Sequence, residues 1–173
     1  VEKQPRLMLY SFQKKWINCQ YVGGETAEIN AVQFSEEVDK RDLNDRVAYV
    51  GRKVGEEKNA FFQQADIFIL PTMNECFPLV ILEAMEYKLP VISTNEGGIP
   101  DMVKDGENGL ICEKQNPVSL ADCIAKLLDD EELRVKMGNA GYDKFCREFT
   151  LQQFEHRMLD ILSQNLPQKE KEN

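Results

Sequence analysis

Two hydrophobic periods alternate along the chain. Short runs rich in β-branched and aromatic residues, bounded by Gly, Pro, Asn or Asp, predict buried strands, and the segments between them carry apolar residues at helical spacing. The expected strands cover residues 18–24, 46–51, 66–71, 90–94 and 109–112. The expected helices cover residues 27–41, 55–65, 78–87, 99–104, 117–129, 130–148 and 150–165.

This order of elements predicts the fold class. The strands lack the polar residue at every second position that a sheet with one solvent-facing side shows, so we expect both of their faces to be buried. Strands that alternate with helices then form a doubly wound, Rossmann-like α/β fold, a parallel sheet with helices on both faces. Ligands of such sheets bind at the carboxyl ends of the strands. Those ends carry Gly51, Pro71 and Ser93-Thr94, with Gly97-Gly98 shortly after.

Length and composition indicate one globular domain. The chain has 173 residues, of which 42% are hydrophobic, enough for one core and too few for two ordinary domains. We assign residues 1–165 to this domain. Residues 166–173, which end in PQKEKEN, are predicted to be a disordered tail.

Charge and cysteine usage exclude several classes of partner. The net charge of −9 is the opposite of the basic surface that nucleic-acid binding requires, so we expect no nucleic-acid partner. The five cysteines are scattered and form no C-x-x-C pair, which predicts neither a disulfide framework nor a zinc site. No apolar run approaches the roughly 18 to 20 residues that a membrane span needs. These features favour a cytoplasmic protein.

The segment NECFPLVILEA contains a helix start that is suited to an anion. Pro78 fits the first position of a helix, and the preceding Phe77 has no side-chain oxygen to accept from the first N–H groups. We therefore expect the N–H groups of Leu79, Val80 and Ile81 to be free. A helix start with free N–H groups, at the carboxyl edge of a parallel sheet, is a site for a phosphate.

Two carboxylates flank this helix start. Glu75 precedes it in the loop, and Glu83 follows in its second turn. Because ionised carboxylates bind sugar hydroxyls strongly, a phosphate beside them suggests a nucleotide sugar. The alternative is that Glu75 only favours the helix dipole and that Glu83 is a solvated helix residue. The spacing of the two glutamates alone favours this simpler interpretation.

A longer stretch resembles a known family. From Ala65 to Asp130 the sequence ADIFILPTMNECFPLVILEAMEYKLPVISTNEGGIPDMVKDGENGLIC, followed by LADCIAKLLDD, closely resembles the carboxy-terminal donor-binding domain of GT-B glycosyltransferases. Within these it is similar to the family 4 group of retaining transferases. The E-x7-E motif of that family is matched by Glu75, the Phe77-Pro78 pair and Glu83, which is followed by Ala-Met.

The resemblance implies a role for each matching position. Glu75 is the catalytic candidate, near the hydroxyls of the donor hexose, and Glu83 binds the ribose hydroxyls. Phe77 and Pro78, which stand between them, are also implied to be donor-binding residues. The N–H groups of Leu79 and Val80 hold the diphosphate.

The resemblance also implies a place for the nucleotide base. The loop of Arg52, Lys53 and Val54 corresponds to the loop against which the base lies in the family. The simpler interpretation of Arg52 and Lys53 as solvated loop charges is at least as well supported by the residues themselves.

Some parts of the family pattern have no match. The first strand of the domain is expected to be missing, and of the Arg and Lys that follow it in the family, only Lys3 is a candidate. The amino-terminal half, which binds the acceptor, has no counterpart either. We therefore expect a carboxy-terminal domain of a larger transferase, inactive by itself.

The implied function is that of part of a glycosyltransferase. Its parent would be a retaining hexosyltransferase of polysaccharide biosynthesis that moves a hexose from a nucleoside diphosphate sugar to a glycan or lipid-linked acceptor, with no metal or other cofactor. Peripheral association of the parent with the inner face of the membrane is one option. The alternative is a non-catalytic nucleotide-sugar-binding or regulatory module that has lost its partner domain.

Overall fold

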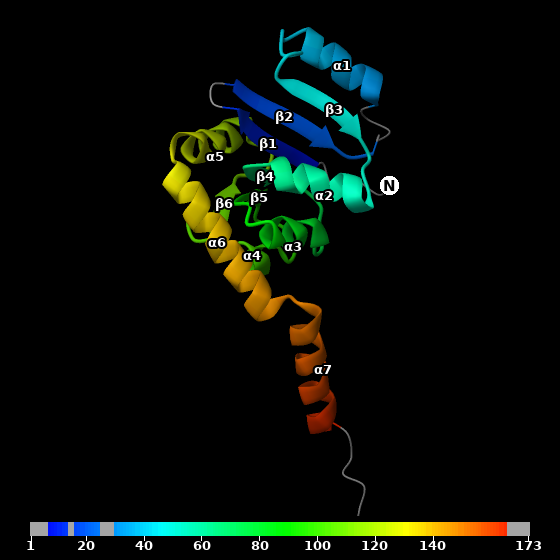
Figure 1. The fold of residues 1–173 in the computed structure, drawn as a ribbon, viewed down its shortest axis with the longest axis vertical. Helices are drawn as coiled ribbons and strands as arrows, with labels where there is room; N and C mark the ends of the chain where they lie inside the picture. Colours follow the sequence, from blue (N-terminus) through cyan, green and yellow to red (C-terminus); the bar gives the residue numbers. More distant parts are fainter. Residues whose placement is uncertain (1–6, 14–15, 25–29, 166–173) are drawn as a thin grey trace, which may run out of the picture.

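A computed structural model describes residues 7–13, 16–24 and 30–165. In this part of the chain there are seven helices and six strands, and the strands form one sheet (Figure 1). The strands are β1 Leu7–Gln13, β2 Trp16–Val22, β3 Val47–Gly51, β4 Ile67–Leu70, β5 Val91–Thr94 and β6 Gly109–Cys112. The helices are α1 Ala31–Asp39, α2 Gly55–Gln64, α3 Leu79–Glu86, α4 Ile99–Met102, α5 Pro117–Asp129, α6 Glu131–Glu148 and α7 Leu151–Asn165.

The predicted α/β fold class is confirmed. The sheet has the strand order β3-β2-β1-β4-β5-β6, the order of a doubly wound sheet. β2 pairs with β3 in parallel, and β4, β5 and β6 form a second parallel set. The carboxyl ends of β4, β5 and β6 therefore meet at one edge of the sheet, where the predicted ligand site begins.

The central strand differs from the prediction of a wholly parallel sheet. The place expected for a missing first strand is taken by β1, which runs antiparallel to both β2 and β4. Only two residues separate β1 from β2. Such a connection can join antiparallel neighbours, whereas a parallel pair needs a crossover of about a dozen residues or more. The parallel first strand is thus replaced by one arm of a hairpin.

Both faces of β4 and β5 are buried, as the strand sequences predict. In β4 the side chains alternate: Phe68 and Leu70 join the core under α2, α3 and α4, while Ile67 and Ile69 join a second core under α5 and the first half of α6. All four side chains are fully buried. The short β4 is therefore anchored on both sides, and the loop after it starts from a rigid position.

Three helices begin at an Asn or Asp cap. Asn30, Asn116 and Asp130 stand at the starts of α1, α5 and α6 and accept from backbone N–H groups of the first turn at 2.8–3.1 Å. Asn and Asp are favoured at this position because their side-chain oxygens reach donors that have no partner inside the helix. The starts of α2 and α3 have no such bond.

The last helix leaves the body of the molecule. α7 extends away from the sheet and its covering helices (Figure 1) and exposes several large apolar side chains. Among the described residues, no helix has both the length and the apolar character that crossing a membrane requires. The predicted tail and Lys3 lie outside the described residues.

Candidate functional site

The start of α3 lies one residue later than predicted. Pro78, expected as the first helical residue, is the N-cap, and the helix begins at Leu79. Its φ of −73° suits a helix, but its ψ of 99° is extended, so it stands just outside. A proline side chain accepts no hydrogen bond. The prediction that α3 has no side-chain cap is therefore correct, although the residue at the cap is Pro78 rather than Phe77.

Two of the three N–H groups expected to be free have no partner. Leu79 and Val80 donate no backbone hydrogen bond within the described part of the chain. The expectation for Ile81 is wrong, because its N–H donates to the carbonyl of Pro78 at 3.0 Å, closing a tight first turn. The side chain of Leu79 is 65% exposed, so this end of the helix faces solvent. Two donors at the positive end of a helix dipole are suited to an anionic oxygen.

A double glycine supports the loop before α3. The N–H of Gly98 donates to the carbonyl of Cys76 at 2.5 Å. Gly97 has a φ of +49°, and a Cβ there would lie 2.5 Å from that same oxygen. Only glycine combines this backbone conformation with so close an approach. The loop after β5 thus fixes the loop that carries Glu75, and both follow adjacent parallel strands.

The Glu75 carboxyl lies in a partly desolvated place. Glu75 is half-buried, and burial raises its pKa, an effect that a hydrogen bond from the backbone of Cys76 partly offsets. A carboxylate that has lost part of its hydration interacts more strongly with a nearby positive charge than a fully solvated one.

Glu83 has a partner that the sequence did not reveal. Its Oε1 accepts from Nζ of Lys58 at 2.7 Å, and the side chains of Glu83 and Lys58 are 36% and 28% exposed. Lys58 belongs to α2, so the ion pair joins the two helices, which lie next to each other (Figure 1). Glu83 follows Leu79 by four residues and shares its helix face. Glu83 therefore lies on the face of α3 that carries the exposed Leu79.

The loop expected to hold the base precedes α2. Arg52 and Val54 are exposed, and Lys53 is half-buried and pairs with Glu57 at 3.4 Å. Val54 is the N-cap of α2 and offers no acceptor, so this loop also ends at an uncapped helix start. Lys58 of α2, four residues after Val54, contacts Glu83 of the glutamate motif.

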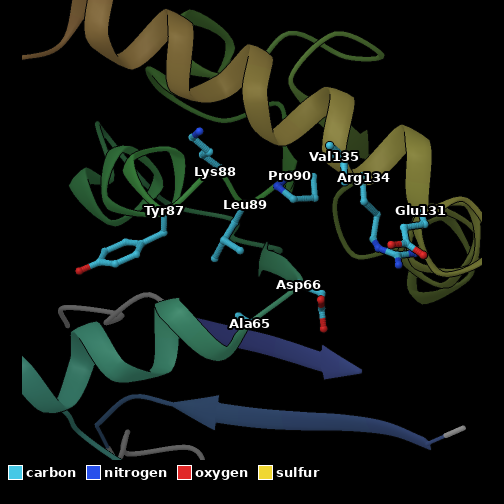
Figure 2. A pocket seen from close by; sticks show the side chains of 9 residues that line it. All are labelled: Ala65, Asp66, Tyr87, Lys88, Leu89, Pro90, Glu131, Arg134 and Val135. Atoms are coloured by element: carbon cyan, nitrogen blue, oxygen red, sulfur yellow. The ribbon is translucent and has the colours of Figure 1, made fainter. Parts of the chain in front are cut away.

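A separate pocket of about 200 Å³ lies at the amino ends of β4 and β5, opposite the candidate site. Figure 2 shows its lining, which comes from Ala65-Asp66 before β4, from residues 87–90 before β5 and from the first turns of α6. None of the predicted site residues belongs to it. Because ligands of doubly wound sheets bind at the carboxyl ends of the strands, this amino-edge pocket is not the candidate site. Within the described ranges, no three His, Cys, Asp or Glu side chains are grouped as a metal site.

Comparisons with known proteins identify relatives of the chain. The family model described as glycosyl transferases group 1 matches residues 8–144. D-inositol 3-phosphate glycosyltransferase of Corynebacterium efficiens is 38% identical over 96 residues, which make up 56% of this chain and 23% of that protein. The chain thus spans less than a quarter of the length of this relative.

Solved structures show the same fold. Sucrose-phosphate synthase of Thermosynechococcus elongatus superposes with a TM-score of 0.72 at 28% identity, over 84% of this chain and 37% of that one. Anabaena HepE in complex with UDP gives a TM-score of 0.75 at 20% identity, over 84% and 40% of the two chains, and shows the fold alone. The matched residues 8–144 contain the whole glutamate motif and the loop before α2. The chain therefore belongs to the glycosyl transferases group 1 family, and its fold is that of a carboxy-terminal GT-B domain.

Proposed function

We propose that this chain binds a nucleoside diphosphate sugar as the donor-binding domain of a retaining glycosyltransferase. In the complete enzyme, a hexose passes from this donor to a glycan or lipid-linked acceptor. The observation that carries the proposal is the open start of α3, with free N–H groups at Leu79 and Val80 and a carboxylate on either side.

The diphosphate binds at the helix start. The N–H groups of Leu79 and Val80 donate to its oxygens, and the turn at Phe77 and Pro78 leaves them accessible because it brings no acceptor of its own. As the diphosphate leaves, its growing negative charge meets the positive end of the α3 dipole. The site needs no divalent metal for this step.

The two glutamates divide the sugar contacts. Glu75 lies by the hexose, where positive charge develops at the reacting carbon, and its partial burial strengthens that electrostatic interaction. Glu83 accepts from the ribose hydroxyls. The loop of Arg52, Lys53 and Val54 lies against the base.

Sugar transfer needs the acceptor-binding half as well. A catalytic cleft between two domains cannot form from one of them, so the 173-residue chain should bind nucleotide without transferring sugar. Transfer by the purified chain would contradict this. A full-length parent that binds nucleotide sugar but transfers nothing to any acceptor would instead indicate a non-catalytic module.

Calorimetry tests the proposal directly. We expect UDP, GDP or ADP to bind the purified chain in buffer that contains EDTA, and UDP is the first choice because the structurally similar HepE was solved with UDP and with UDP-glucose. A strict requirement for a divalent ion would contradict the metal-free site. Absence of binding by all three nucleotides, with or without a divalent ion, would overturn the proposed function.

A further inference from the structure

The ion pair between α2 and α3 is the feature of this edge that the glutamate motif does not explain. Nζ of Lys58 lies 2.7 Å from Oε1 of Glu83, within hydrogen-bond distance. The two residues are 25 positions apart and come from different helices. The pair is partly sheltered from solvent, since both side chains are only partly exposed. It therefore depends on the packing of α2 against α3.

The ion pair bears on how the site can accept a negatively charged ligand. A nucleoside diphosphate is an anion, and the candidate site offers it two carboxylates, Glu75 and Glu83. Like charges in one site repel each other, and a neighbouring cation offsets this repulsion. Of the lysines in the first turn of α2 and the loop before it, Lys53 is paired with Glu57, and Lys58 is paired with Glu83. Lys58 thus offsets the charge of the glutamate that lies nearest along α3 to the free N–H groups.

The same contact fixes the direction of the carboxylate. Lys58 occupies Oε1 of Glu83, whereas Oε2 has no hydrogen-bond partner among the described residues. An ionised carboxyl can accept about four hydrogen bonds, so one ammonium contact leaves room for two hydroxyls. Side chains of a helix lean toward its amino end, and Glu83 lies one turn after Leu79. The contact with Lys58 therefore restrains a carboxylate that lies one turn after the uncapped helix start and leaves Oε2 open to a further donor.

We propose that Lys58 is a positioning residue for nucleotide binding, which orients Glu83 and offsets its charge so that the carboxylate accepts from the nucleotide's ribose hydroxyls. This rests on the proposed function of the site. Lys58 also ties the loop of Arg52, Lys53 and Val54 to α3, because it lies in the first turn of the helix that this loop precedes. The loop that contacts the base and the glutamate that contacts the ribose are thereby held at a fixed distance from each other.

The test is a double-mutant cycle measured by calorimetry with UDP. Lys58→Met keeps most of the apolar stem and removes the charge, and we expect it to weaken UDP binding by roughly 10-fold, within the range of coupling between contacting residues. Lys58→Arg keeps a cation and its donors and should stay within roughly 3-fold of wild type. In a Glu83→Gln background, Lys58→Met should have little further effect, because the group it positions is gone.

A second ligand separates positioning from direct contact. With 2′-deoxy-UDP, which lacks one ribose hydroxyl, the loss caused by Lys58→Met should shrink. Lys40→Met is the matched control, since Lys40 forms a 2.8 Å pair with Glu37 on the remote α1. Thermal unfolding of each variant checks that the fold is kept.

Three results would overturn the inference. Equal UDP affinity of Lys58→Met and wild type would show that the pair has no role in binding. An equal loss from Lys58→Met in the wild-type and Glu83→Gln backgrounds would show that Lys58 contacts the ligand itself. A loss matched by Lys40→Met would reduce the effect to net charge. If wild type binds no UDP, GDP or ADP, the proposed function fails first, which distinguishes that outcome from these three.

Discussion

Two helix starts at the carboxyl edge of the sheet, those of α3 and α5, differ in whether a side chain caps the first N–H groups. α5 follows β6 and α3 follows β4, and each start contains a proline. At α5 the residue before the proline is Asn116, which accepts from two backbone N–H groups at 3.0 and 3.1 Å. At α3 it is Phe77, and the cap itself is Pro78, so no side chain accepts.

The difference decides where the N–H groups of the first turn find partners. The donors of α5 are satisfied within the chain, which stabilises the helix by about 1 kcal/mol. Those of α3 at Leu79 and Val80 remain available. Leaving a cap empty lowers stability, and at α3 the proposed function requires these donors to be open, in a loop that Gly97 and Gly98 hold in place. α5 is therefore the natural internal control for α3.

The largest effect is expected at Glu75, before the uncapped helix. Under the proposed function its carboxylate stabilises the transition state more than the bound donor, so Glu75→Gln in the full-length parent should lower the rate of sugar transfer by roughly 10- to 1000-fold, with little change in nucleotide affinity. Single-turnover kinetics would isolate the chemical step. A rate near wild type would leave Glu75 as a residue that only favours the helix dipole.

A cap introduced at α3 should convert it into a start like that of α5. Pro78→Asp places a carboxylate where it can accept from the first-turn N–H groups, which fills the donors and repels the diphosphate, so UDP affinity should fall by roughly 10- to 100-fold. Thermal stability should hold or rise. Pro78→Ala removes the ring without adding an acceptor, and the difference between the two variants in calorimetry measures the effect of capping. Equal affinities would place the diphosphate elsewhere.

Much of this comparison was predictable from sequence because it rests on local chemistry. The runs around β4 and β5, the proline at the start of α3 and the glycines at 97–98 each indicate a structure through backbone preferences of neighbouring residues. The strands of the parallel sets and all seven helices were therefore predicted to within a few residues. The shift of the α3 start by one residue reflects a ψ angle, which proline does not fix.

Features that depend on tertiary contacts were missed. From the sequence, Lys58 is predicted to be a solvated lysine of a helix. Only the packing of α2 on α3 brings it to Glu83. β1 was also overlooked, although its sequence LMLYSFQ opens with a short run of apolar and aromatic residues that is consistent with a buried strand. Its antiparallel direction follows from the short connection to β2, a hairpin where the family resemblance implied a parallel strand.

The second glutamate should affect binding rather than catalysis. If Glu83 holds the ribose in both the ground state and the transition state, Glu83→Gln in the parent should raise the apparent KM for the nucleotide sugar by roughly 5- to 10-fold and leave kcat nearly unchanged. Calorimetry with UDP on the 173-residue chain should show a loss of the same order. A fall in kcat at constant KM would contradict a ribose-binding role for Glu83 and indicate a role in the chemical step.

The smallest effect on binding is expected at the capped helix. Asn116→Ala removes both cap bonds of α5 and should lower the free energy of unfolding by about 1 kcal/mol. UDP affinity should not change, because no donor of the binding site is involved. Chemical denaturation and calorimetry on the same preparation give both numbers. A loss of affinity would mean that the α5 start takes part in the site.

The amide resonances of the two helix starts test the central claim most directly. In a ¹⁵N-labelled sample titrated with UDP, the N–H signals of Leu79 and Val80 should shift strongly, as expected when free donors gain a charged acceptor, while those of Val118 and Ser119, already bonded to Asn116, should stay in place. The Pro78→Asp variant should lose the response at Leu79 and Val80. Saturable UDP binding that leaves both of these signals unmoved would contradict a diphosphate site at the start of α3.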